Sequence, residues 1–234
     1  MTDLALRHRH GRRRSTADRI MVLIGIAGVV TLAGAPIAYM LWPQPAPVSV
    51  DAPALPITVG GVAFNLPPAA IRVAMQRLPG AQARVDLAFV WPSLDPPDLT
   101  AKPTPAMPPN LAERLFVTIA ASDGTLAPAE RFKTIYPRYT AQPETIGSNG
   151  LAMRGFRTGT PYQGEELVYD PGAPERFLLR CTHAVSSTPG MCLHERRIAG
   201  ADVTVRFPRD WLNDWRSVAD GIDRLLVKLR PAGG

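Results

Sequence analysis

The chain of 234 residues lacks the short motifs that mark common enzyme classes. It contains no G-x-S-x-G elbow, no Walker A loop, no G-x-G-x-x-G fingerprint and no H-E-x-x-H zinc motif. Histidine is scarce too: two of the four lie in the first ten residues, which leaves His183 and His194. A Ser-His-Asp site would need one of these two side chains. We therefore predict no catalytic residue and no cofactor, and the sequence alone identifies no biochemical function.

Lysine is also rare, at 3 of the 26 basic residues. The net charge of +6 comes mostly from the first 19 residues, which hold 6 basic and 2 acidic side chains. From residue 43 onward, 20 basic residues face 18 acidic ones. This balance gives no general attraction to polyanions, and no aromatic residue interleaves with the arginines of the tail. We expect no nucleic-acid partner.

A single long hydrophobic run, residues 20–41, contains no charged side chain. A helix of this length can cross a hydrocarbon core of about 30 Å. The arginines of the preceding tail keep the N-terminus in the cytoplasm by the positive-inside rule. The sequence thus predicts a single-pass bacterial inner-membrane protein whose C-terminal domain is periplasmic.

Two alternatives remain open for this run. Ala33–Ala35 resembles the cleavage site of a signal peptide, although Pro36 follows it directly. The small residues Ala27, Thr31 and Ala35 recur every four residues, which allows a homodimer through the membrane helix. The downstream domain is exported in either case.

The remaining composition divides the chain into segments. We predict a basic cytoplasmic tail (1–19), a transmembrane helix (20–42), a proline-rich linker (43–56) and a periplasmic domain (57–230) with a proline-rich loop at 92–110. Apolar side chains that alternate or follow β-branched runs predict strands. These cover residues 57–64, 84–91, 115–120, 151–157, 165–169, 177–183, 191–198 and 203–207.

Helical spacing of apolar residues predicts helices at 67–78, at 127–136 and at 211–229. The last is the clearest, because its apolar stripe from Trp211 to Leu229 lies opposite a charged face. The fold class is therefore α+β, with a mostly antiparallel sheet and a C-terminal amphipathic helix packed on it.

The two cysteines, Cys181 and Cys192, lie on neighbouring strand candidates of the exported domain. We predict that they form a disulfide, because the periplasm is oxidising. Zinc held by Cys181-x-His183 and Cys192-x-His194 is the alternative. If the cysteines face each other, however, the histidines are about 13 Å apart, which is too far for one ion. We therefore expect no metal site.

Direct pairing of the cysteines also has a cost. It places Leu179 opposite His194 and Phe177 opposite Arg196, so apolar side chains meet polar ones. Either this face of the sheet is not wholly buried or the register contains a bulge. The sequence leaves both readings open.

Two groups of charged residues are candidate sites. Glu165 and Glu166 are adjacent in a strand and point to opposite faces, so they do not form an acid pair. Asp202, Arg206, Arg209 and Asp210 could form a surface ion-pair cluster of small energetic value.

We expect a membrane-anchored periplasmic interaction or accessory protein of the cell envelope that is non-catalytic and binds a protein partner. The first alternative is an envelope hydrolase, which requires a cleft containing His183 or His194. The second is a periplasmic ligand-binding or toxin-neutralising protein.

Overall fold

The computed structural model describes residues 48–98, 113–184 and 189–231. The predicted tail, transmembrane helix and homodimer face lie outside these residues, as do parts of the linker and of the 92–110 loop. Among the residues described, no helix is both long and apolar enough to cross a bilayer. The predicted segment boundaries stay predictions.

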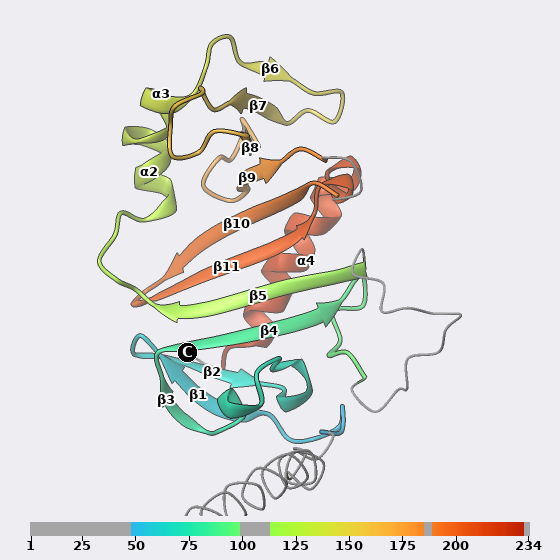
Figure 1. Cartoon of the computed structure of the whole chain (residues 1–234). Helices are drawn as coiled ribbons and strands as arrows, with labels where there is room; N and C mark the ends of the chain where they lie inside the picture. The colour runs from blue at the N-terminus through green and yellow to red at the C-terminus, as the bar shows by residue number, and fades with distance from the viewer. Residues whose placement is uncertain (1–47, 99–112, 185–188, 232–234) are drawn as a thin grey trace, which may run out of the picture. The chain divides into compact units, whose positions relative to one another are not determined.

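An antiparallel eight-stranded sheet of order β4-β5-β11-β10-β9-β8-β7-β6 forms the body of the domain (Figure 1). Its strands are β4 (Arg84–Val90), β5 (Arg114–Ala121), β6 (Thr145–Ile146), β7 (Ala152–Gly155), β8 (Glu165–Tyr169), β9 (Leu178–Thr182), β10 (Met191–Ile198) and β11 (Ala201–Pro208). A smaller sheet of order β2-β1-β3 contains β1 (Leu55–Val59), β2 (Val62–Leu66) and β3 (Gly80–Gln82). The predicted mostly antiparallel architecture is confirmed.

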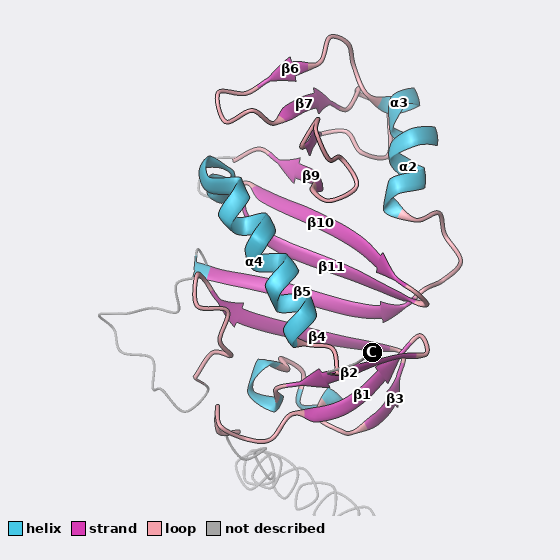
Figure 2. Ribbon diagram, turned by 180° about the vertical axis from the view of Figure 1, so that it is seen from behind, coloured by secondary structure: helices cyan, strands magenta, loops and turns pink. Residues whose placement is uncertain are grey.

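The C-terminal helix α4 (Trp215–Lys228) lies across one face of β4, β5, β11 and β10 (Figure 2). Its residues Val218, Ile222 and Leu225 are each 1% exposed and belong to the main hydrophobic core. A 3-10 segment, η4 (Arg209–Asp214), precedes it, so the α-helix is shorter than the predicted one. The prediction that an amphipathic helix packs on the sheet is confirmed.

Gly221 in the middle of α4 has a packing role. A β-carbon at this position would lie 2.7 Å from the ring of Trp91, which follows β4. That ring in turn stacks on Trp211, with ring centroids 4.9 Å apart. Glycine weakens a helix by about 1 kcal/mol relative to alanine. Here it allows the helix to approach the tryptophan pair closely.

At the end of the sheet formed by β7, β8 and β9, two short helices cover the face that lies opposite to the α4 side. The short helices α2 (Pro128–Thr134) and α3 (Tyr136–Tyr139) lie beside β7, β8 and β9 (Figure 1). Tyr136, Leu167 and Leu178 belong to a second hydrophobic cluster at this place. The sequence predicted one helix here, but Pro137 carries no backbone N–H and the chain forms two.

The predicted helix at 67–78 is wrong. The segment instead contains two 3-10 turns, η1 (Pro68–Ala70) and η2 (Ala74–Gln76). Between them Ile71 is extended and forms an isolated bridge with Leu87 of β4, which ends the helical turn. As a result, Met75 and Leu78 are 85% and 63% exposed rather than buried.

Candidate functional site

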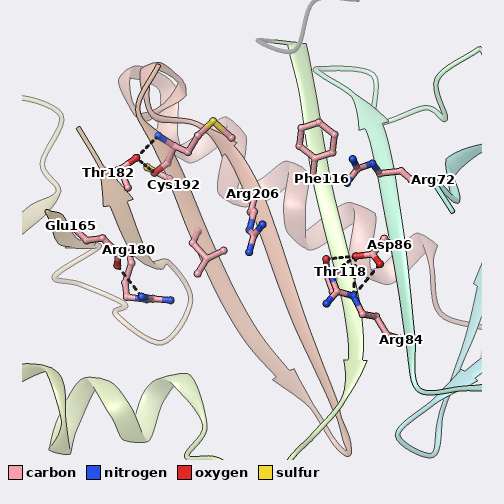
Figure 3. A pocket seen from close by; sticks show the side chains of 12 residues that line it. Arg72, Arg84, Asp86, Phe116, Thr118, Glu165, Arg180, Thr182, Cys192 and Arg206 are labelled. Atoms are coloured by element: carbon pink, nitrogen blue, oxygen red, sulfur yellow. Dashed lines mark hydrogen bonds and ion pairs between the residues drawn. The ribbon is translucent and has the colours of Figure 1, made fainter. Parts of the chain in front are cut away.

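The side of β4, β5, β11 and β10 that faces away from α4 is called the open face below (Figure 1). Strand alternation creates it: along β5, Leu115 and Val117 are buried towards α4, so Phe116 and Thr118 point to the other side. A cavity of about 550 Å³ lies on this face (Figure 3). Its lining residues are Arg72, Arg84, Asp86, Phe116, Thr118, Glu165, Arg180, Thr182, Met191, Cys192, Leu193 and Arg206.

The strand register fixes the centre of this cavity. Phe116 of β5 is opposite Arg206 of β11, Arg206 is opposite Leu193 of β10, and Leu193 is opposite Arg180 of β9. The four side chains therefore form one row across four strands. Cationic and apolar side chains alternate along it.

Asp86 of β4 is fully engaged by its neighbours (Figure 3). Its carboxylate accepts hydrogen bonds from Arg84 at 2.8 Å, from the Thr118 hydroxyl at 2.8 Å and from the Gln76 amide at 3.2 Å. The hydrogen bond from Arg84 is the largest cause that lowers the pKa of Asp86 to about 2. This carboxylate therefore stays ionised at neutral pH. Its hydrogen bonds link β4, β5 and the segment that contains Gln76.

A second ion-pair group lies on the β9 side. The Arg180 guanidinium is 2.8 Å from the Glu165 carboxylate and 3.7 Å from that of Glu195. Glu195 is also 3.1 Å from Arg131 of α2. These carboxylates have cationic partners, so neither is a free acid or base.

Two cations of the cavity have no such partner. Within the described ranges, Arg72 and Arg206 form no ion pair with a carboxylate, and both are exposed. The Arg72 guanidinium instead lies 4.7 Å from the centre of the Phe116 ring, a cation–π contact. Figure 3 shows Phe116 between these two arginines. With four arginines and two carboxylates in its lining, the cavity carries an excess of two positive charges.

A smaller cavity of about 220 Å³ lies farther along the same side of the sheet. Arg131, Glu195, Arg197 and Asp202 are among its lining residues. Arg131 pairs with Glu195, and Arg197 pairs with Asp202 at 2.7 Å. Since its charges are matched within the protein, this cavity offers little to a charged ligand.

The cysteines are where the sequence predicted them. Cys181 and Cys192 are directly opposite in the register of β9 and β10 and form a disulfide of 2.05 Å. Both sulfurs are therefore unavailable as zinc ligands. Within the parts of the chain that the structure covers, no group of three or more His, Cys, Asp or Glu residues could hold a metal ion.

Neither of the two histidines lines the cavity. His183 is exposed at the end of β9, whereas His194 is 1% exposed on the α4 side of the sheet. The His194 Nδ1 lies 3.0 Å from the Leu178 carbonyl oxygen, and Nε2 has no hydrogen-bond partner among the described residues. Burial lowers its pKa to about 4, so the imidazole is neutral at pH 7.

The mismatch expected from direct cysteine pairing is resolved without a bulge. Leu179 does pair with His194, and His194 is nevertheless buried, because the imidazole uses the Leu178 carbonyl as its partner. Arg196, whose side chain is 28% exposed, reaches Asp223 of α4 at 2.7 Å. The face is thus buried at His194 and partly open at Arg196, and each polar side chain has a specific partner.

The remaining charged residues are only partly where the sequence placed them. Glu165 pairs with Arg180, and Glu166 pairs with Arg209, so the two glutamates point to opposite faces as predicted. The predicted surface cluster does not form as expected: Asp202 pairs with Arg197. Arg206 is left on the open face, because strand alternation puts it beside Phe116.

No family model matches this chain, and no curated protein is similar to it in sequence. One solved structure shares the fold, and a second matches more weakly. An immunity protein of the Stenotrophomonas maltophilia type IV secretion system is 13% identical, and the match covers 76% of this chain and 94% of that one, with a TM-score of 0.51. The iron-regulated outer membrane lipoprotein FrpD of Neisseria meningitidis is 9% identical over 79% of this chain and 97% of its own, with a TM-score of 0.41.

The first likeness is one of fold. It places this domain among proteins that share its arrangement of sheet and helix, and at 13% identity it transfers no residue of a site. The chemistry of the cavity must therefore be argued from the side chains of this chain.

Sequence reasoning missed Arg72 and Phe116, and it placed Arg206 in the wrong group. One signal was present for Phe116. In the strand at 115–120 the buried residues are Leu115, Val117 and Ile119, so Phe116 is a large aromatic on the polar side of the alternation. A large aromatic side chain on the side of a strand that faces away from the core indicates a surface that contacts something other than water.

The disulfide is expected to stabilise the domain by between about 2 and 3 kcal/mol, because it closes a short loop and reduces the entropy of the unfolded chain. Replacing both cysteines by alanine should lower the free energy of unfolding by this amount in urea titrations. A reducing agent should have the same effect on the wild type and none on the double variant. Equal midpoints for wild type and variant would contradict the expectation.

Proposed function

We propose that this protein is a non-catalytic interaction protein of the bacterial envelope that binds a partner protein through its open face. The observation that carries the proposal is the pair of exposed arginines, Arg72 and Arg206, on either side of Phe116. Among the residues that the structure describes, neither has a carboxylate partner. Arginine and aromatic side chains are enriched at the centres of protein interfaces. The other charges of this cavity are already paired within the domain.

The placement of the histidines disfavours the hydrolase alternative. That alternative needs a histidine in a cleft, but neither His183 nor His194 lines the 550 Å³ cavity or the 220 Å³ cavity. The carboxylates of the larger cavity, Asp86 and Glu165, are held by arginines. This arrangement provides charge and shape for binding and lacks a general base poised beside a nucleophile.

Location in the envelope is supported by the disulfide between Cys181 and Cys192. Disulfides of this kind form and persist in oxidising compartments such as the periplasm. In our proposal the predicted transmembrane helix at 20–42 anchors the chain in the inner membrane, and the proline-rich stretch before β1 holds the domain a short distance from it.

Neutralisation of a toxin is the second candidate. The observation that favours it is the fold shared with an immunity protein of a type IV secretion system. Both candidates require a protein partner on the open face. They differ in its nature: the second requires the partner to be toxic when this protein is absent.

Charge reversal tests the proposed function. The full-length chain is purified in mild detergent from membranes of cells that produce it in place of the native copy, and co-purifying proteins are quantified by mass spectrometry. We expect Arg206→Glu to reduce recovery of a specific partner at least tenfold. Arg224→Glu is the matched control, because Arg224 is an exposed arginine on α4, which covers the other face of the sheet. Recovery of the protein alone, or equal recovery with both variants, would refute the proposal.

A further inference from the structure

We infer that the partner presents a carboxylate beside an apolar side chain, and that it docks with the carboxylate at Arg72 and Arg206 and the apolar group on the segment from Ile71 to Gly80. This inference rests on the proposed function and names the chemistry of the partner. It combines two independent observations, one of charge and one of exposed apolar surface.

Two exposed arginines lie at the row of side chains in the centre of the cavity. Arg206 is flanked in the register by Phe116 and Leu193, and Arg72 lies over the Phe116 ring at 4.7 Å. Both guanidinium groups are exposed, so a carboxylate of a partner can reach them. A carboxylate there would form charge-assisted hydrogen bonds, which are about twice as strong as neutral ones. The two positive charges in excess favour an anionic group of the partner.

The apolar observation concerns the segment that carries Arg72. Val73, Met75 and Leu78 are 42%, 85% and 63% exposed. Three large apolar side chains within six residues are thus open to solvent beside the cavity. Clustered exposed apolar side chains indicate an interaction site, whereas single ones need no explanation. Methionine is especially common at interfaces because its side chain adapts to the partner.

This segment is held in place rather than loose. The Gln76 side chain makes two hydrogen bonds to Asp86, from its amide to the carboxylate at 3.2 Å and from the Asp86 backbone N–H to its carbonyl at 2.8 Å. The Arg77 guanidinium donates two hydrogen bonds to the Ile71 carbonyl, and the Gln82 amide donates to the Gln76 and Leu78 carbonyls. The exposed side chains are therefore presented by an ordered backbone, which lowers the entropic cost of binding.

Asp86 connects the exposed apolar segment with the open face of the sheet. The same carboxylate pins the apolar segment through Gln76 and binds Arg84 and Thr118 at the floor of the open face. The segment that exposes Met75 is therefore fixed to β4, which pairs with the strand that carries Phe116. A surface with an apolar patch next to cations is complementary to a partner with an apolar side chain next to a carboxylate.

The inference is tested with a zero-length crosslink. In Arg206→Lys the side chain keeps its positive charge and gains a primary amine. A water-soluble carbodiimide joins this amine to a carboxylate in direct contact: an amide forms, and the carbodiimide takes up the water that is lost and becomes a urea. The reagent is applied to native membranes that contain the full-length variant, and the joined peptides are identified by mass spectrometry. Arg224→Lys is the matched control, and Arg72→Lys serves as a second probe of the same site.

We expect R206K or R72K to couple to an aspartate or glutamate of another protein at least fivefold more than R224K does. Adding Met75→Ser should reduce that coupling several-fold, because it removes the exposed apolar contact. Equal coupling of all three lysine variants, amides formed only within the chain, or no effect of Met75→Ser would overturn the inference. If R206E abolishes partner recovery but the lysine variants form no amide with a partner, the proposed function stands and the carboxylate partner does not.

Discussion

Replacing Gly60 by alanine is expected to destabilise the protein by about 4 kcal/mol. Gly60 and Gly61 form the turn between β1 and β2, and this turn meets the turn between β10 and β11 at Gly200. A β-carbon on Gly60 would lie 1.9 Å from the Gly200 carbonyl oxygen, a backbone atom that cannot rotate away. Overpacking of this kind costs typically 1–3 kcal/mol, and the left-handed backbone, with φ of +57°, adds about 1–2 kcal/mol.

Gly61 provides the matched control. It lies in the same turn, has φ of +79°, and has no atom within 4 Å of an added β-carbon. Gly61→Ala should therefore cost only the 1–2 kcal/mol of the left-handed conformation. Chemical denaturation of the two variants measures the difference. Equal losses of stability would show that the two turns are not in contact and that the small sheet is not fixed to the large one at this point.

Lowering the pH from 6.5 to 4 should cost about 3 kcal/mol of stability through His194 alone. The folded state holds this imidazole neutral, with its pKa at about 4, mainly because of burial. In the unfolded chain the ordinary pKa is 6.5. Between these two values the unfolded state binds a proton that the folded state refuses, so stability falls as the pH falls. Above pH 6.5 the effect is absent, and below pH 4 it is complete.

The charged groups around His194 do not change this direction. Arg196 lowers the imidazole pKa further, whereas the carboxylates of Asp223 and Glu195 raise it by smaller amounts. Measuring the free energy of unfolding at steps from pH 7.5 to 4 tests the prediction. His194→Gln can keep the hydrogen bond to the Leu178 carbonyl without the titrating group, so its stability should change far less over this interval. If the free energy of unfolding fell equally with pH in the wild type and in His194→Gln, the assigned pKa would be contradicted.

The strands were largely predictable from the sequence because burial on alternate positions leaves a periodic record. Residues 165–169 and 191–198 were predicted with the bounds that the structure shows for β8 and β10. The disulfide was predicted because both cysteines lie on neighbouring strand candidates of an exported domain, and the structure places Cys181 opposite Cys192. A strand whose one face is buried specifies its own register.

The segment at 67–78 shows why the candidate site could not be predicted. Its apolar residues from Ile71 onward have helical spacing, yet of these only Ile71 is buried, where it pairs with Leu87 of a later strand. Local periodicity cannot reveal that the backbone of a residue will form a β-bridge with a strand far away in the sequence. The same non-local contact leaves Met75 and Leu78 exposed beside the open face.

His194 illustrates a second limit. A histidine opposite leucine on an apolar face argued against burial, since a buried polar group needs a hydrogen-bond partner. The partner is a backbone carbonyl, that of Leu178 on the neighbouring strand. Backbone acceptors are present at every residue, so the sequence cannot show which of them is available.

The central claim is that the open face of the sheet binds a protein in the envelope, and site-specific photocrosslinking in intact cells tests it most directly. A photoreactive phenylalanine analogue is placed at position 206 on the open face, or at position 224 on α4, in the full-length chain. We predict that position 206 gives a discrete adduct with one partner protein, whereas position 224 gives none. Adducts of equal yield at both positions, or an adduct at 224 alone, would contradict the claim.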